Sequence, residues 1–106
     1  MLSYIDSLVD AINYNNYSEV APYILDNSPL EDMQIGLINR LTENGTTEEV
    51  IDREVVSIEE SGNNWLVKTN ETIKIIYKSG KEEVSDYTWT YTVEKVEGNY
   101  YVSNIE

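Results

Sequence analysis

Hydrophobic residues recur every three to four positions through the first 45 residues of the chain, and at every second position after that. A spacing of three to four places apolar side chains on one face of an α-helix, whereas strict alternation places them on one face of a β-strand. The change near Gly45 therefore predicts helices first and strands afterwards, which is an α+β order.

Three helices are expected in the first part of the chain. Ser3 followed by Asp6 is typical of a helix start. The apolar positions that follow lie on one helical face: Tyr4, Ile5, Leu8, Val9 and Ile12. A short second helix is expected from Tyr17 to about Leu25, although Pro22 should shorten or bend it because proline lacks the backbone N–H.

The third helix has the strongest local signals in the sequence. Ser28 is the expected N-cap, Pro29 occupies the first helical position, and Glu31 completes the capping box. Its predicted buried stripe is made of Leu30, Met33, Leu37, Ile38 and Leu41. Asn44 and Gly45 are expected to end the helix with a left-handed residue.

Four alternating segments follow, and only short loops separate them. They are residues 50–60, 65–77, 83–96 and 100–105. Loops this short join antiparallel neighbours, so we expect a four-stranded antiparallel meander with the helices packed on one face. The inward set of the last strand stays open between Tyr101 with Ile105 and Tyr100 with Val102.

The second hairpin of this sheet can be placed in register. The apolar residues of its two strands share a face only if the loop has an odd length, and a turn with Gly80 in the left-handed conformation meets that condition. The register then places Glu71 opposite Tyr87 and Thr69 opposite Trp89.

Composition narrows the range of functions. The chain has no cysteine and no histidine, which excludes disulfides, thiolate or histidine metal ligands and a Ser–His–Asp triad. Twenty acidic and seven basic residues give a formal net charge of −13, which disfavours nucleic acids and anionic lipid surfaces. No calcium loop, phosphate-binding glycine loop or membrane-spanning apolar run occurs, so we expect no metal, no cofactor and no insertion of this domain into a membrane.

Glu71 is the one carboxylate in the middle of an otherwise apolar strand face. Such a group can act as a general base or as the polar anchor of a pocket. It can equally be a hydrogen-bonded structural acid, or a bulge can turn it to solvent. Tyr87, Trp89 and Tyr91 are expected on the same face, where they form either a stacking wall for a ligand or simply the core side of the sheet.

Groups of residues spread over the whole chain carry a resemblance to a known family. They are Tyr4-Ile5, Ala11-Ile12-Asn13, Tyr17-Ser18-Glu19-Val20, Pro22-Tyr23-Ile24, Ser28-Pro29-Leu30, Ile73-Lys74-Ile75, Tyr77-Lys78-Ser79-Gly80, Tyr91-Thr92-Val93 and Tyr100-Tyr101-Val102-Ser103. Together with the order of helices and meander, they resemble the C-terminal domain of TcaA-type (teicoplanin-resistance-associated) bacterial envelope proteins. That domain has the nuclear transport factor 2-like, or cystatin-like, fold with a curved sheet.

The resemblance implies that residues 1–106 are a single domain cut from a longer, membrane-anchored protein of a Gram-positive bacterium. It implies an extracytoplasmic location and a link to cell-wall homeostasis and glycopeptide susceptibility. The expected function is that of a non-enzymatic interaction domain, with a cell-wall polymer or an envelope protein as its partner. A homodimer formed through the polar sheet face is a further candidate assembly.

A different class of function is the alternative. The same fold hosts isomerases and dehydratases, which use a carboxylate base and an acidic hydrogen-bond donor inside a hydrophobic cone. Glu71 with Tyr87 and the helix residue Tyr23 would be the nearest equivalent in this chain. An open pocket with Glu71 at its base would favour a small-molecule site or enzyme, and a filled cone would favour the interaction domain.

Overall fold

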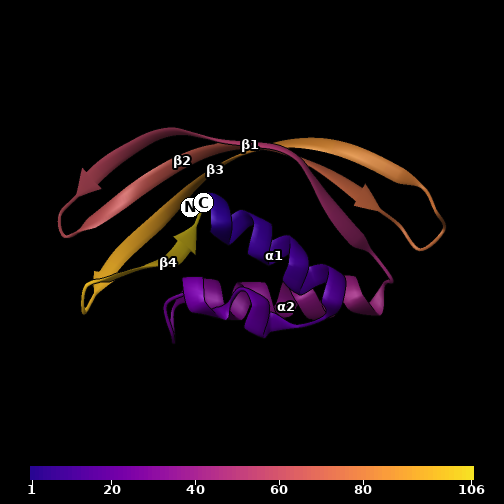
Figure 1. Cartoon of the computed structure of the whole chain (residues 1–106), viewed down its shortest axis with the longest axis horizontal. Helices are drawn as coiled ribbons and strands as arrows, with labels where there is room; N and C mark the ends of the chain where they lie inside the picture. The colour runs from indigo at the N-terminus through magenta and orange to yellow at the C-terminus, as the bar shows by residue number, and fades with distance from the viewer.

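A long arched sheet lies over two α-helices in the computed structural model, which describes all 106 residues (Figure 1). In chain order the elements are α1 (Leu2–Tyr14), the 3₁₀ helices η1 (Tyr17–Glu19) and η2 (Ala21–Tyr23), α2 (Pro29–Glu43), β1 (Thr47–Ser61), β2 (Asn64–Ile76), β3 (Glu82–Val96) and β4 (Asn99–Ile105). The last helix ends at Glu43 and the first strand begins at Thr47, on either side of Gly45, which confirms the predicted α+β order.

The sheet is the predicted antiparallel meander, with the strand order β1-β2-β3-β4. Glu71 pairs with Tyr87 and Thr69 pairs with Trp89, so the predicted register of the second hairpin is confirmed. Gly80 has a φ of 89°, the left-handed conformation that the turn requires. The first strand begins at Thr47, three residues earlier than the alternation indicated.

A bulge in the last strand pair settles which residues of β4 face the core. Val93 pairs with Val102 while Tyr91 pairs with Ile105, and the register shifts between Thr92 and Val93. Because the extra residue reverses the alternation, Val102 and Ile105 both pack against the core. The inward set therefore takes one residue from each of the two predicted alternatives.

The prediction of a second α-helix between Tyr17 and Leu25 is wrong. Residues 17–25 form two three-residue 3₁₀ helices, η1 and η2, in place of an α-helix. Pro22 is the physical reason, because inside a continuous α-helix it has no N–H to donate and its ring would clash with the carbonyl four residues before it. Val20 and Ile24 are nevertheless buried, so this segment still contributes to the core.

Two details of the other helices also differ from expectation. Ser3 lies inside α1, whose N-cap is Met1 and has no side-chain cap hydrogen bond. The α2 cap is confirmed, since the Ser28 hydroxyl accepts a hydrogen bond from the Glu31 N–H at 3.4 Å. On α2, however, Met33 is 48% exposed, and the polar residue Gln34 takes a buried place in the stripe with 4% exposure.

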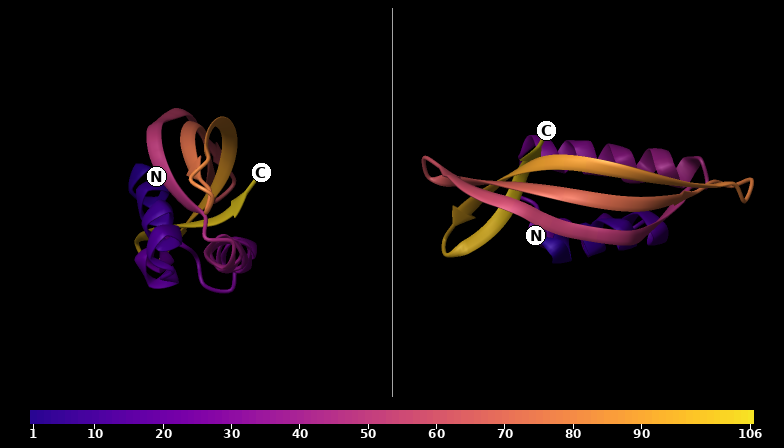
Figure 2. Two further views of the ribbon diagram at one scale, coloured as in Figure 1. Left: turned by 90° about the vertical axis from the view of Figure 1, so that its right-hand side faces the viewer. Right: turned by 90° about the horizontal axis from the view of Figure 1, so that it is seen from above.

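Both α-helices cover the concave face of the sheet, side by side (Figure 2). The core between the layers consists of Tyr4, Ile5, Ala11, Ile12, Val20, Ile24, Leu30, Ile38, Tyr91 and Val102. Full burial of each large aliphatic side chain stabilises the fold by about 1.5–3 kcal/mol. The arch is longer than the helices, so both ends of its concave face extend beyond them (Figure 1).

Candidate functional site

Glu71 is buried on the concave face of the sheet. The alternation of β2 points it inward between Thr69 and Ile73, and it is 7% exposed. Its Oε2 accepts one hydrogen bond from the Thr69 hydroxyl at 2.8 Å and another from the Tyr91 hydroxyl at 2.7 Å. A buried carboxylate requires such donors, because leaving water without them would cost several kcal/mol.

A second polar pair lies beside this carboxylate. The Tyr91 ring meets the Tyr4 ring edge to face, with 5.5 Å between ring centroids, and Gln34 Nε2 donates a hydrogen bond to the Tyr4 hydroxyl at 3.1 Å. Burial raises the pKa of the Tyr91 hydroxyl far above its ordinary value, and the Glu71 carboxylate raises it further. Burial also raises the pKa of the Tyr4 hydroxyl, so both phenols keep their protons at ordinary pH.

Glu71 and Gln34 line a cavity of about 200 Å³ between the sheet and the two α-helices, which we call the inner cavity. Its lining consists of Ile5, Leu8, Val9, Gln34, Leu37, Glu48, Glu71, Ile73, Tyr87, Trp89, Tyr91 and Ile105. Burial raises the pKa of the Glu48 carboxyl, and the nearby negative charge of Glu71 raises it further. The inner cavity thus combines two carboxylates and one amide side chain with an otherwise apolar and aromatic wall.

Four of the five sequence-predicted site residues meet in the inner cavity: Glu71, Tyr87, Trp89 and Tyr91. The Tyr87 and Trp89 rings stack at 5.7 Å with an interplanar angle of 12°. Tyr23 is not among them, because η2 places it against a different cavity beside α1 and β4.

Sequence reasoning missed two polar residues of the inner cavity, Gln34 and Glu48. Gln34 follows Leu30 by four positions and precedes Ile38 by four. This spacing places it on the buried face of the helix, so its inward position could have been predicted from the sequence. Glu48 lies before residue 50, where the alternation of apolar and polar residues begins, so the sequence pattern did not assign it to a strand face. Its backbone N–H and C=O are both held by the Asn13 side chain at 2.8 Å, which fixes the start of β1 against the end of α1.

The second cavity, of about 510 Å³, lies between the start of α1, η2 and the part of the sheet near the β1–β2 hairpin, and we call it the apolar groove. All of its lining residues are hydrophobic: Met1, Leu2, Tyr4, Tyr23, Val55, Ile58, Trp65, Val67, Val93, Tyr100, Tyr101 and Val102. The groove has no carboxylate, amide or basic group in its wall, so it can hold an apolar group but has no acid–base pair with which to transform one.

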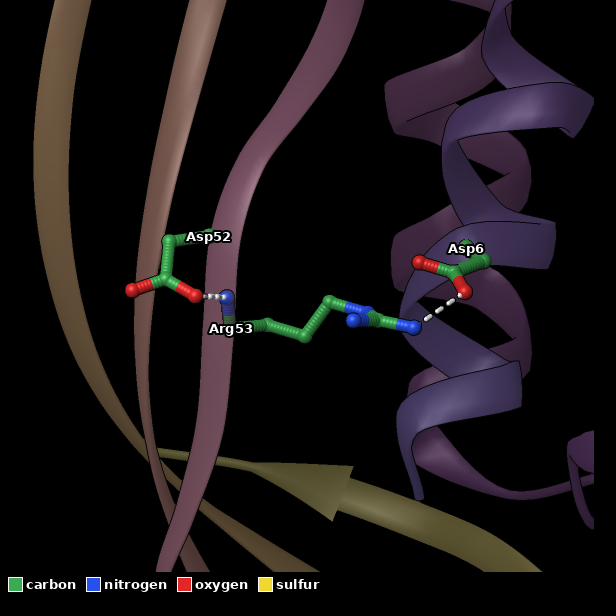
Figure 3. A network of polar contacts seen from close by, with 3 residues as sticks. All are labelled: Asp6, Asp52 and Arg53. Carbon is green, nitrogen blue, oxygen red and sulfur yellow. Dashed lines mark hydrogen bonds and ion pairs between the residues drawn. The ribbon is translucent and has the colours of Figure 1, made fainter.

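An ion pair joins β1 to α1 (Figure 3). Arg53 Nη2 lies 2.8 Å from Asp6 Oδ2, and the Asp52 carboxylate accepts a hydrogen bond from the Arg53 backbone N–H at 2.9 Å. Along β1, Arg53 falls between Glu48 of the inner cavity and Val55 of the apolar groove. The pair therefore ties the helix to the sheet between the two lined regions.

No cluster of three or more Asp, Glu, His or Cys side chains in the chain is arranged to hold a metal ion. None of its helices combines the length and the hydropathy that crossing a membrane requires.

The fold with its cavities under a curved sheet defines an α+β domain of the nuclear transport factor 2-like, cystatin-like class. A nuclear transport factor 2-like protein from Shewanella oneidensis superposes with a TM-score of 0.61 and 10% identity, over 98% of this chain and 92% of that one. A cystatin-like domain from Nostoc punctiforme gives a TM-score of 0.64 and 15% identity, over 97% and 70%. At these identities the likeness shows the fold alone.

The sequence comparison is more specific. The family model of the TcaA protein NTF2-like domain matches residues 1–106, and the chain belongs to that family, as the sequence led us to expect. It is also 34% identical to the uncharacterized membrane protein YvbJ of Bacillus subtilis over 106 residues, which is all of this chain and 18% of that protein. The chain thus spans less than a fifth of the length of this relative.

Proposed function

We propose that this domain is a non-enzymatic interaction module, held outside the bacterial membrane by a longer membrane-anchored chain. Its partner is an apolar segment of another envelope protein, which binds in the apolar groove. The observation that supports the proposal is the lining of that groove, about 510 Å³ in volume with only hydrophobic residues in its wall. Covering an apolar surface of this kind with a partner removes it from water and lowers the free energy of the complex.

The chemistry of the groove favours a protein segment over a cell-wall polymer. Sugars and charged wall peptides need hydrogen-bonding side chains, and the groove wall offers only the hydroxyls of its tyrosines and the indole N–H of Trp65, with no carboxylate or amide. The net charge of −13 adds a second requirement, because it attracts partners with basic residues and repels acidic polymers. The proposed ligand is therefore an apolar segment flanked by lysine or arginine.

The location and biological role are parts of the same proposal. The relative YvbJ is a membrane protein, and the family model is that of a TcaA protein domain. A chain without cysteine is also compatible with an extracytoplasmic compartment. We accordingly infer that the parent protein takes part in cell-wall homeostasis and influences glycopeptide susceptibility through this contact.

Site-specific photo-crosslinking tests the proposal. A photoreactive amino acid replaces Ile58, which lines the groove and is 64% exposed, and in a matched control it replaces Val84, which is 60% exposed on β3 outside the groove. Both proteins are incubated with Bacillus subtilis envelopes. We expect a crosslink from position 58 alone, mapped by mass spectrometry to an apolar, basically flanked segment of an envelope protein. The substitution Tyr100→Asp in the groove should abolish it.

Three other outcomes would contradict the proposal. A product carrying wall sugars or wall peptides would place the polymer in the groove. A crosslink between two copies of this chain would point to self-association, including a homodimer, as the use of this surface. Equal labelling from positions 58 and 84 would mean that the groove has no specific role.

A further inference from the structure

The inner cavity is lined by two carboxylate acceptors, on Glu48 and Glu71, and by two side chains that carry donors, the Tyr87 hydroxyl and the Trp89 indole N–H. The hydroxyl of Tyr91 is already used, since it donates to Glu71. Gln34 is 4% exposed and donates through Nε2 to Tyr4, which leaves its Oε1 buried without any partner. A buried acceptor without a donor costs about 1–3 kcal/mol.

The chain supplies no cation to these acceptors. Arg53 lies opposite Glu71 in the strand register, but its guanidinium is paired with Asp6. Lys74 on β2 is paired with exposed acids, Glu49 and Glu82. Neither Glu48 nor Glu71 forms an ion pair, so the negative charge in the inner cavity is not balanced from within the protein.

The remainder of the wall suits an organic cation. Tyr87, Trp89 and Tyr91 present aromatic rings, and the first two are stacked on each other. The negative face of an aromatic ring attracts ammonium groups, and its surface also packs against hydrocarbon. A metal ion is disfavoured by the same lining, because no three carboxylate or imidazole ligands converge there.

We propose that the inner cavity binds a small protonated amine, with its ammonium group held by Glu48 and Glu71 and its hydrocarbon part against Tyr87 and Trp89. The volume of about 200 Å³ limits the ligand. At about 30 Å³ per water molecule, the space corresponds to roughly six to seven waters, so the ligand has about that number of heavy atoms. This site is separate from the apolar groove and does not depend on its proposed partner.

Tryptophan fluorescence can follow binding directly. The chain has two tryptophans; Trp89 lines the inner cavity and Trp65 lines the apolar groove. The Trp65→Phe variant therefore reports on the inner cavity alone. It is titrated with n-butylammonium chloride and, as a neutral control of the same size, with n-butanol. We expect a saturable change in Trp89 emission for the amine, at a concentration about tenfold or more below that needed for the alcohol.

Two charge-removing variants test the assignment of the acceptors. Glu71→Gln keeps the shape of the side chain and an oxygen that accepts the hydrogen bonds from Tyr91 and Thr69. Glu48→Gln changes only a half-buried residue, so it keeps the test valid if the first variant fails to fold. Each should weaken butylammonium binding about tenfold or more and leave butanol binding unchanged. Tyr23→Phe, in the apolar groove, should change neither.

The proposal is overturned if butylammonium produces no saturable change or binds no more tightly than butanol. It is also overturned if both glutamine variants retain full amine affinity. Such results would leave only bound water in the inner cavity. They would not affect the proposed function, which depends on the apolar groove and is tested with a different probe.

Discussion

Tyr91 donates a hydrogen bond of 2.7 Å to Glu71 across the sheet, although the two residues are not paired in the strand register. Tyr91 lies opposite Val67, four residues along β2 from Glu71. The length of the phenol ring lets its hydroxyl reach along the concave face to the carboxylate. Removing the hydroxyl alone therefore tests how much the buried acid depends on one donor.

The substitution Tyr91→Phe should lower the free energy of unfolding by about 1.5–3 kcal/mol, the range for hydrogen bonds to charged groups. Glu71 would keep only the donor from Thr69. Urea unfolding of the variant and the wild type measures the difference. Tyr87→Phe removes a hydroxyl from the same cavity that makes no hydrogen bond to Glu71, and it should cost clearly less. Equal losses in the two variants would mean that the Tyr91 hydroxyl has no special role in holding the acid.

The folded-state pKa of Glu48 predicts a pH dependence of stability. Burial and then the charge of Glu71 raise this pKa above its ordinary value of 4.5. The folded state therefore binds the Glu48 proton more tightly than the unfolded chain, and the resulting stability is present below the ordinary pKa and is lost as the pH rises through the raised value.

The substitution Glu48→Gln removes this ionisation, so its stability relative to the wild type should rise between pH 4 and pH 7. Thermal unfolding at a series of pH values measures that difference. Glu43→Gln removes the same charge from an exposed position at the end of α2 and corrects for the change in net charge. A gap between the Glu48→Gln and Glu43→Gln proteins that stays constant with pH would refute the prediction.

Replacing two different glycines by alanine should change the stability of the protein in opposite directions. Gly45 has a φ of 68°, and a Cβ there would lie 3.1 Å from the Lys78 side chain, so Gly45→Ala should destabilise the protein by about 1 kcal/mol or more. Gly36 lies within α2, where an added Cβ meets nothing within 4 Å, and Gly36→Ala should stabilise by about 0.5–1 kcal/mol. Chemical denaturation measures both. Stability changes of the same sign would contradict the different backbone requirements of the two positions.

The ion pair between Arg53 and Asp6 should contribute little to stability. The two side chains are 34% and 47% exposed, so water and salt screen the interaction. We expect Asp6→Asn to cost about 0.2–1 kcal/mol at low ionic strength and less in 1 M NaCl. Urea unfolding at the two salt concentrations provides the comparison, and a large loss that is independent of salt would show that the pair is a buried structural contact.

Much of the sheet was predictable because its determinants are local. The alternation of β2 and β3 and the left-handed Gly80 turn determine that Glu71 pairs with Tyr87, and the same alternation points Glu71 toward the core. Burial of Glu71 on the concave face was therefore inferable from the sequence, and so was a tyrosine hydroxyl as its donor, but not which tyrosine. Thr69 is a local donor two residues away on the same strand, whereas Tyr91 reaches Glu71 from the neighbouring strand.

The sequence by itself determined the order of helices and strands, the register of the second hairpin and the isolated acid on the core face, since period and turn chemistry act over a few residues. The tertiary structure decided the rest. It placed Tyr23 in a different cavity from Glu71, brought Gln34 and Glu48 beside that acid, and used a bulge to turn both Val102 and Ile105 inward. These outcomes depend on contacts between segments far apart in the chain, which no local pattern encodes.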